Sequence, residues 1–356
     1  MKFVHTGDIH WGMCPDADKP WGKERAQAIK DTFKAIISRT KEMEADCLFI
    51  SGDLFHRQPL LKDLKEVNYL FSTIPSVKVI IIAGNHDRIR ENSALLSFTW
   101  SPNVTFLMDQ RLTSVYFEDI NTEVYGFSYH TAEIKTPVLE DIQVPLNNRI
   151  QILMAHGGDA SHVPMNFNSL ELSPFSYIAL GHIHKPQVMG EKKMAYCGSP
   201  EPLDMTETGP HGFYAGEIHP VTRRLIRLDF IPAAKLQYIP LAVNVSKDTT
   251  NGELCDRIEK EIRGRGTENI YRFRIKGMRA PEIEFDLYSL TSCYRIAEVI
   301  DDSEPQYDFS ALFAEHSSDM IGFFIQALQK ENMSPVEKKA LYYGVNALLH
   351  TTDERS

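Results

Sequence analysis

The sequence lacks any apolar run that could cross a membrane as a helix, which requires about 18 residues. Its longest apolar run, residues 77–83, is interrupted by Lys78. The first carboxylate, Asp8, follows Met1 too closely for the apolar core of a signal peptide to form between them. From these absences we expect a cytoplasmic protein that does not enter a membrane.

Paired cysteines and an excess of positive charge are also missing. The five cysteines include no Cys-x-x-Cys pair, which argues against a disulfide framework and a zinc-thiolate site, so we expect reduced thiols mostly in the core. The formal charge of −10 disfavours a nucleic-acid partner, although acidic residues that hold metal ions are counted in this sum as bare charge. The 356 residues contain no internal repeat or low-complexity tract and match the length of about two domains.

Two alternating patterns fill the first 230 residues. Short β-branched apolar runs, typical of buried strands, alternate with longer stretches that carry apolar residues at helical spacing. This alternation predicts an α/β fold in which helices flank a buried sheet. The predicted strands are residues 2–6, 47–51, 77–83, 150–155, 177–180, 195–198, 212–218 and 224–231, and the predicted helices are 26–37 and 61–71.

The pattern changes near Pro232. Beyond it, short strands around one helix predict a small α+β domain, and two further helices end the sequence. These elements are the strands 236–245, 270–275 and 293–299 and the helices 252–262, 318–330 and 335–349. We therefore predict a main α/β domain over residues 1–232, a small α+β capping domain over 233–305 and a helical, partner-binding tail over 306–356.

Five of the predicted strands in the main domain end in residues that can bind metal ions. These segments are Gly7-Asp8-Ile9-His10, Gly52-Asp53-Leu54-Phe55-His56, Gly84-Asn85-His86-Asp87, His156-Gly157-Gly158 and Gly181-His182-Ile183-His184. Any one of them also fits an ordinary turn, because glycine, asparagine and aspartate all favour turns. Ligands gather at the carboxyl ends of the strands in an open α/β sheet, so we expect the five segments to meet at one edge.

The spacing and number of these side chains favour two metal ions. Asp8 and His10 are two residues apart, as are His182 and His184, so both side chains of each pair lie on one side of an extended backbone. Two aspartates, one asparagine and four histidines are too many for one tetrahedral ion. Imidazole, carboxylate and amide ligands suit manganese, iron or zinc better than magnesium or calcium. Two such ions about 3.5–4 Å apart would support hydrolysis of a phosphate ester by an activated water.

The order of these segments resembles the calcineurin-like metallophosphoesterase superfamily over approximately residues 1–200. Within that superfamily, residues 52–56, 84–87, 179–185 and 196–200 resemble the SbcD-type DNA repair exonucleases. The resemblance implies a β-sandwich flanked by helices for the main domain, which would be the nuclease domain. The small α+β domain and the C-terminal helices are also similar to this branch, with weaker motifs.

The resemblance also implies roles for individual residues. One ion would be held by Asp8, His10, Asp53 and His184. The second would be held by Asp53, Asn85, His156 and His182, with Asp53 bridging the two ions. His86 would lie beside the scissile phosphate to stabilise developing charge or assist the leaving oxygen, and His56 would help to place the DNA backbone.

Residues beside these segments are predicted to contact the substrate. They are Arg57, Arg88, Lys185 and Ser199. The basic members give the predicted edge a positive rim, which is compatible with DNA despite the negative net charge. One departure from the family pattern is the run His156-Gly157-Gly158, where relatives can have another residue after the histidine.

The function implied by the resemblance is that of a manganese-dependent DNA exonuclease and endonuclease that acts with an SbcC-like SMC ATPase. The C-terminal helices would dock this ATPase, and apolar stripes on residues 61–71 and 95–98 would form a homodimer. One alternative is a small-molecule phosphodiesterase or phosphatase of the same superfamily. A second is a DNA-tethering scaffold with a vestigial metal site, which is disfavoured because no catalytic position is degraded.

Overall fold

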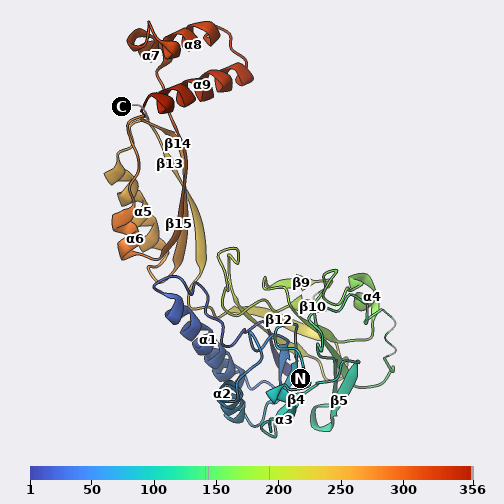
Figure 1. The fold of residues 1–356 in the computed structure, drawn as a ribbon. Helices are drawn as coiled ribbons and strands as arrows, with labels where there is room; N and C mark the ends of the chain where they lie inside the picture. Colours follow the sequence, from blue (N-terminus) through green and yellow to red (C-terminus); the bar gives the residue numbers. More distant parts are fainter. Residues whose placement is uncertain (141, 143, 192, 354–356) are drawn as a thin grey trace. The chain divides into compact units, whose positions relative to one another are not determined.

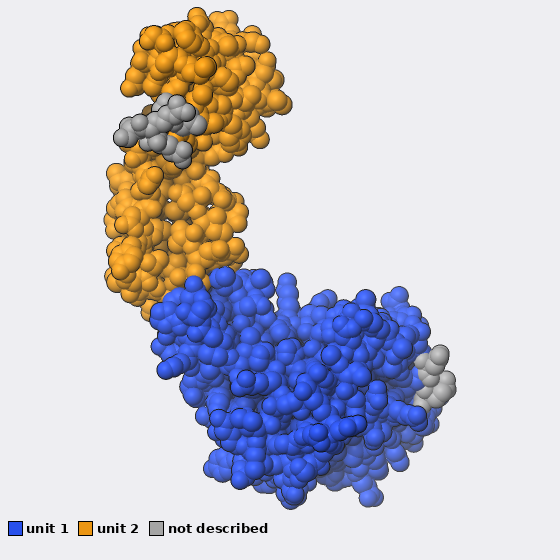
Figure 2. All heavy atoms as spheres, in the orientation of Figure 1, with its two compact units in different colours: residues 1–239, 268–270 blue, residues 240–267, 271–356 orange. Residues whose placement is uncertain are grey.

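The computed structural model describes residues 1–140, 142, 144–191 and 193–353. The chain divides into two compact units, coloured separately in Figure 2. The first comprises Met1–Ile239 with Glu268–Ile270, and the second comprises Pro240–Thr267 with Tyr271–Ser356. The three independent domains expected from the sequence stay a prediction.

Two six-stranded sheets build the first unit, as far as the described residues show (Figure 1). The first sheet has the order β12-β11-β1-β2-β3-β4, in which β1 to β4 are parallel neighbours. Its strands are β1 (Lys2–Thr6), β2 (Cys47–Ser51), β3 (Lys78–Ile82), β4 (Val104–Phe106), β11 (Gly212–Ile218) and β12 (Leu225–Pro232). The second sheet has the order β5-β6-β7-β8-β10-β9. Its strands are β5 (Thr113–Phe117), β6 (Thr122–Gly126), β7 (Ile150–His156), β8 (Tyr177–Gly181), β9 (Gln187–Met189) and β10 (Met194–Tyr196).

The two sheets pack face to face as a β-sandwich. In β2, Cys47 and Phe49 pack between the sheets with Ile152 and Ala179 of the second sheet. Successive strand residues point to opposite faces, so Leu48 and Ile50 of β2 contact the helices on the outer face. Because both faces of these strands are buried, they read in the sequence as continuous apolar runs. The predicted α/β fold, a β-sandwich flanked by helices, is confirmed.

Helices cover the outer faces of the sandwich (Figure 1). Helix α1 (Gly22–Glu42) and helix α2 (Leu61–Ser72) bury their apolar stripes against the first sheet. Helix α4 (Phe167–Leu172) covers the second sheet through Leu170. The shorter helices are α3 (Ala94–Ser97) and the 3₁₀ turn η1 (Glu118–Ile120).

Most predicted strands of this unit are confirmed, and three of them match to the residue: β1, β2 and β11. Strands β7 and β8 run further than predicted, to His156 and Gly181. Four short strands, β4, β5, β6 and β9, were not predicted. No helix in the part of the chain that the structure describes is long and apolar enough to span a membrane.

The second unit contains several helices and the sheet β13-β14-β15, apart from Tyr238, Ile239 and Ile270, which are assigned to the first unit. Its strands are β13 (Tyr238–Val245), β14 (Ile270–Arg279) and β15 (Ile296–Pro305). Its helices are α5 (Asn251–Arg265), α6 (Tyr288–Cys293), α7 (Phe309–Glu315), α8 (Met320–Leu328) and α9 (Pro335–Asp353). Thr250 and Glu253 form a capping box that begins α5.

Strand β15 runs to Pro305, past the predicted end at residue 299, and so includes an acidic segment next to the predicted domain boundary. Two acidic side chains of β15 pair with arginines of β14, since Arg272 Nε lies 2.5 Å from Glu298 Oε2 and Arg274 Nη1 lies 3.0 Å from Asp302 Oδ2. Pairs of opposite charge on neighbouring strands stabilise a sheet, which explains how an acidic segment remains in the strand.

All five cysteines are free, as predicted, but their expected place in the core is wrong for most of them. Cys47 and Cys197 are buried, Cys255 is partly exposed, and Cys14 and Cys293 are exposed.

A buried ion pair ties α1 to the segment that follows β10. Arg25 and Glu201 are almost fully buried, and Arg25 Nη1 donates to Glu201 Oε2 at 3.1 Å. Thr32 Oγ1 and the backbone N–H of Lys235 also donate to Glu201, each at 2.5 Å. The contacts join segments far apart in the sequence.

We expect Arg25→Ala to lower the free energy of unfolding by about 3 kcal/mol, because it leaves a buried carboxylate without its cation. This is the lower end of the usual range, since Thr32 and Lys235 still donate to Glu201. Arg39→Ala, which removes an exposed pair with Glu42, is the control and should change stability little. Equal urea midpoints for the two variants would contradict the assignment.

Candidate metal centre

The ends of β1, β2 and β3 in one sheet and of β7 and β8 in the other bring the predicted metal-binding segments together. The backbone N–H groups of Asp8 and His10 donate to the carbonyls of Gly52 and Asp53, each at 3.0 Å. The N–H of His182 donates to both carboxylate oxygens of Asp8, at 3.1 and 3.0 Å. This last contact joins the two sheets at the predicted edge.

The described residues contain four groups of metal-binding type, and two of them overlap at Asp8. One comprises Asp8, His10 and His184, and the other comprises Asp8, Asp53 and His156; in each, the candidate ligand atoms lie within 4.8 Å of one another. Asn85 adjoins the second cluster, because its Oδ1 lies 3.0 Å from His156 Nε2.

The clusters share the space around Asp53. Asp53 Oδ2 lies 3.3 Å from His156 Nε2 and 3.8 Å from His10 Nε2. The nitrogen His10 Nε2 in turn lies 3.3 Å from His184 Nε2. The predicted bridging carboxylate is therefore placed between the histidines of both clusters.

The backbone is strained where it presents these side chains. Asp8, His10 and Asp53 have φ values of 48°, 50° and 48°, in the left-handed region that costs free energy for residues other than glycine. Gly84 is required for close approach, because a Cβ there would lie 2.3 Å from Asp53 Oδ1.

Two of the predicted ligand histidines are held in orientation by hydrogen bonds on the ring nitrogen that faces away from the centre. His156 Nδ1 lies 2.9 Å from the carbonyl of Ser51, so it carries the proton and Nε2 faces Asp53. His184 Nδ1 lies 2.5 Å from Glu207 Oε1, so its Nε2 faces His10. Hydrogen bonds of this kind set which nitrogen of a histidine is free to bind a metal.

The electrostatics of the centre favour a bound cation. Burial raises the pKa of Asp8. Burial also opposes a charge on Asp53, yet the adjacent His156 holds the pKa of Asp53 well below its usual range. For His156, burial lowers the pKa but the charge of Asp53 outweighs it, so the pKa rises to about 9. A proton on His156 thus balances the charge of Asp53 here, a role that a divalent cation can fill with the same donor set.

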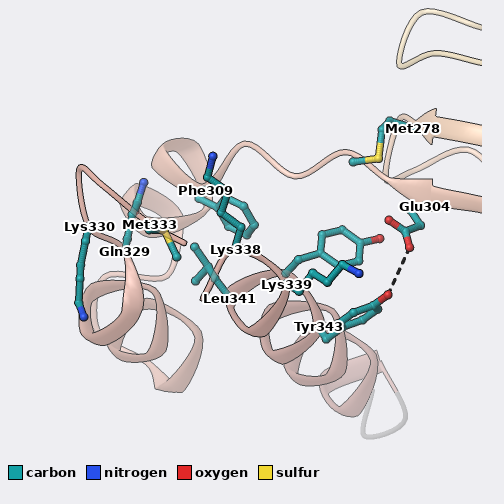
Figure 3. Close-up of a pocket in the computed structure, with 11 residues that line it drawn as sticks. Met278, Glu304, Phe309, Gln329, Lys330, Met333, Lys338, Lys339, Leu341 and Tyr343 are labelled. Carbon is teal, nitrogen blue, oxygen red and sulfur yellow. Dashed lines mark hydrogen bonds between the residues drawn. The ribbon is translucent and has the colours of Figure 1, made fainter. Parts of the chain in front are cut away.

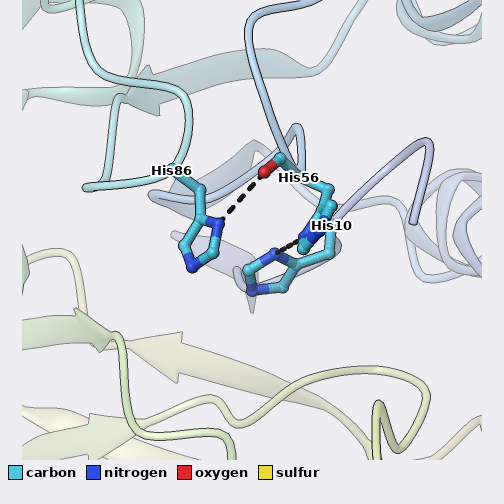
Figure 4. Close-up of side chains that lie close together, drawn as sticks. All are labelled: His10, His56 and His86. Carbon is cyan, nitrogen blue, oxygen red and sulfur yellow. Dashed lines mark hydrogen bonds between the residues drawn. The ribbon is translucent and has the colours of Figure 1, made fainter. Parts of the chain in front are cut away.

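His56 and His86 lie together with His10 beside the clusters (Figure 4). The rings of His56 and His86 stack with centroids 5.2 Å apart, and His86 Nδ1 lies 3.0 Å from the carbonyl of His56. His86 is also tied to the centre through its N–H, which donates to Asp53 Oδ1 at 2.9 Å. These contacts leave His86 Nε2 available to a ligand.

A cavity of about 450 Å³ opens beside this histidine pair. His56, Asn85 and His86 form one side, and its basic lining residues are Arg57, Arg88 and Arg90. The predicted positive rim is present at this point.

The other two predicted substrate-binding residues are placed elsewhere. Lys185 is exposed and does not line the cavity. Ser199 is buried, and its Oγ donates to Glu207 Oε2 at 3.1 Å, so it lies behind His184 rather than facing a substrate.

Sequence reasoning assigned no role to two carboxylates that shape the centre. Asp87 is buried and accepts the N–H groups of Gly84 at 2.8 Å and Phe55 at 3.1 Å, which joins the loops after β2 and β3. Burial raises the pKa of Asp87 to about 7. Its place within a metal-binding segment was a usable signal, whereas Glu207 lies in a segment without a motif.

Comparisons with known proteins agree with this geometry. The sequence model of the calcineurin-like phosphoesterase family matches residues 1–186. The chain is 28% identical to the DNA double-strand break repair protein Mre11 of Methanocaldococcus jannaschii over 280 residues, 73% of this chain and 74% of that relative. It is 26% identical to the protein of the same name from Archaeoglobus fulgidus over 259 residues, 65% of this chain and 56% of that relative. The chain thus spans little more than half the length of the second relative.

We expect Asp53→Asn and His86→Ala to separate metal binding from hydrolysis. Asp53→Asn should weaken the binding of both ions, because the carboxylate of Asp53 lies between the two clusters. His86→Ala should keep the metal content and lower hydrolysis on the order of 10²–10⁴-fold, the usual effect of a positioned proton-transfer group. Calorimetric titration with Mn²⁺ and phosphodiester assays would measure the two effects, and metal loss in His86→Ala would make it a ligand instead.

Proposed function

The chain belongs to the calcineurin-like phosphoesterase family, and from this premise we propose that it is a metal-dependent nuclease that hydrolyses DNA phosphodiester bonds in double-strand break repair. The observation that carries the proposal is the pair of carboxylate and histidine clusters beside an arginine-lined cavity. The two relatives named for double-strand break repair support the choice of DNA as substrate.

Two divalent ions, with manganese favoured by the donor set, would occupy the clusters. Asp8, His10 and His184 would hold the first, and Asn85, His156 and His182 the second, with Asp53 shared between them. The distances around Asp53 support this division. When bound, the ions supply an activated water and neutralise charge on the phosphate.

His86 would act on the phosphate directly. Its Nδ1 is engaged by the carbonyl of His56, so Nε2 is the atom that would hold or deliver a proton at the leaving oxygen. His56 would keep His86 in place by stacking and contact the DNA backbone beside it.

Local charge supports a DNA substrate in spite of the acidic net charge. Arg57, Arg88 and Arg90 line the cavity next to His86. Guanidinium groups bind phosphate oxygens in a bidentate manner, and exposed charges beyond about 10 Å are largely screened at 0.1 M salt. A phosphate at the centre would therefore be influenced chiefly by these arginines and the ions.

A small-molecule phosphodiesterase is the alternative, and the cavity arginines separate the two. We expect the double variant Arg57→Ala, Arg88→Ala to lose at least tenfold in cleavage of a labelled duplex with a free end. Hydrolysis of bis-p-nitrophenyl phosphate should fall by a clearly smaller factor, because that substrate lacks the flanking DNA phosphates that the arginines would also bind. Lys185→Ala, outside the cavity, is the matched control. Wild-type cleavage of the small substrate alone would favour the alternative.

The helical tail supports the proposed SMC ATPase partner. Helices α8 and α9 form a small core of their own from Ile321, Ile325, Leu341 and Val345. Apolar side chains on the same helices remain exposed, namely Met320, Phe323, Val336 and Tyr343.

A pocket of about 490 Å³ lies beside α9 (Figure 3). Met278, Met333 and Leu341 form its apolar lining, and lysines surround it: Lys330, Lys338 and Lys339. An amphipathic helix with acidic flanks fits such a surface. We propose that the SbcC-like ATPase contributes this helix.

Deletion of residues 316–356 should abolish co-purification with the ATPase and spare hydrolysis of bis-p-nitrophenyl phosphate. Phe323→Ser tests the exposed apolar face of α8 without removing the small core, since this side chain is 56% exposed. Leu146→Ser, at an exposed site in the first unit, is the control. Retained co-purification in the Phe323 variant and the deletion would refute the docking role.

The homodimer and the cytoplasmic location stay predictions. Of the stripes proposed for the dimer, Leu64, Val67 and Phe71 are buried within the chain, whereas Leu61 and Leu96 are exposed. A dimer interface would therefore use these exposed residues, together with Leu60 and Tyr69, which are also exposed.

A further inference from the structure

His182 makes a contact that the predicted ligand set does not explain. Its Nε2 lies 2.8 Å from Asp159 Oδ2. Asp159 follows His156 by three residues and is 46% exposed, whereas the His182 side chain is 16% exposed. The carboxylate thus lies at the outer side of the metal centre, beyond the histidine.

The loop after β7 holds this carboxylate in place. Gly157 has φ of 138°, and a Cβ there would lie 2.2 Å from the carbonyl of His162. Asp159 Oδ1 accepts the N–H groups of Ser161 at 2.7 Å and His162 at 2.9 Å. With Oδ1 engaged in the turn, Oδ2 is directed to the imidazole of His182. The glycines that depart from the family pattern therefore permit the turn that carries Asp159.

We propose that Asp159 is a positioning residue that fixes the orientation and tautomer of His182. The carboxylate accepts a hydrogen bond from the protonated Nε2, which leaves Nδ1 as the nitrogen that can bind an ion. The inference rests on the proposed function, in which His182 and His184 serve different ions.

A matched arrangement on the neighbouring histidine supports this role. His184 is held through Nδ1 by Glu207, at 2.5 Å, so its Nε2 faces the centre. The two histidines of one short motif would thus bind through different nitrogens, each selected by its own carboxylate. Asp159 also contacts His162 Nδ1, at 3.0 Å from Oδ2, so His162 supports the carboxylate from the other side.

Asp159→Asn isolates the contact with His182. The amide oxygen can still accept hydrogen bonds from the N–H groups of the turn. The amide nitrogen cannot accept a hydrogen bond from the imidazole. We expect calorimetric titration of the full chain with Mn²⁺ to show two changes. The affinity for one ion should fall about 10–100-fold, the usual effect of losing such a partner, and the affinity for the other ion should be unchanged. Asp159→Glu, which keeps a carboxylate, should recover part of the affinity.

Glu207→Gln is the matched control, because it removes the equivalent partner of His184. Glu207→Gln should lower the affinity for one ion by a similar factor. The double variant, with both Asp159→Asn and Glu207→Gln, should lower the affinity for both ions. If the double variant weakens only one ion, the two carboxylates do not serve different ions and the proposal is wrong.

Three further outcomes would also overturn the role of Asp159. Unchanged affinity for both ions with a lower melting temperature would show that it only stabilises the loop. If the wild type binds three ions and Asp159→Asn loses one of them completely, Asp159 is a ligand of a separate site with His162. Binding of fewer than two ions by the wild type would refute the two-ion proposal itself. The wild-type titration alone shows this failure, before any variant is compared.

Discussion

Two buried carboxylates at the junction of the sheets constrain the rest of the first unit. Asp8 and Asp53 are almost inaccessible to solvent, and their partners among the described residues are backbone N–H groups and histidines. A buried carboxylate without compensation costs several kcal/mol. The loops after β2, β3 and β8 therefore converge on these two side chains, and the strained backbone at Asp8 and Asp53 persists because the surrounding contacts hold it.

The same constraint explains the groups behind the histidines. A neutral imidazole offers one donor and one acceptor, so a partner on the far nitrogen decides which atom faces the carboxylates. The Ser51 carbonyl does this for His156 and Glu207 does it for His184. Both partners come from positions distant in sequence, so the orientation of the site depends on the closure of the whole sandwich rather than on any one loop.

The fold was predictable where one local pattern determines the element. Strands β1 and β2 are buried on both faces and read as apolar runs, and the end of each run marks the position of Asp8 and Asp53. Strand β15 was predicted only in part, because its acidic end is stabilised by pairing with β14, which is invisible to composition. The role of Glu207 was not predicted for the same reason. Nothing in the sequence around Glu207 indicates that its side chain contacts His184.

The net charge of the sequence says little about which substrate the metal centre accepts. The formal charge of −10 includes Asp8 and Asp53, whose charges would be balanced within the centre by the ions they hold, and Glu298 and Asp302, which pair with arginines of β14. Two divalent ions would add four positive charges beside Arg57 and Arg88, at the one place where a phosphate must bind. Because salt screens exposed charges beyond about 10 Å at 0.1 M, the sign of this local field, and not the sign of the total, decides which substrates the centre accepts.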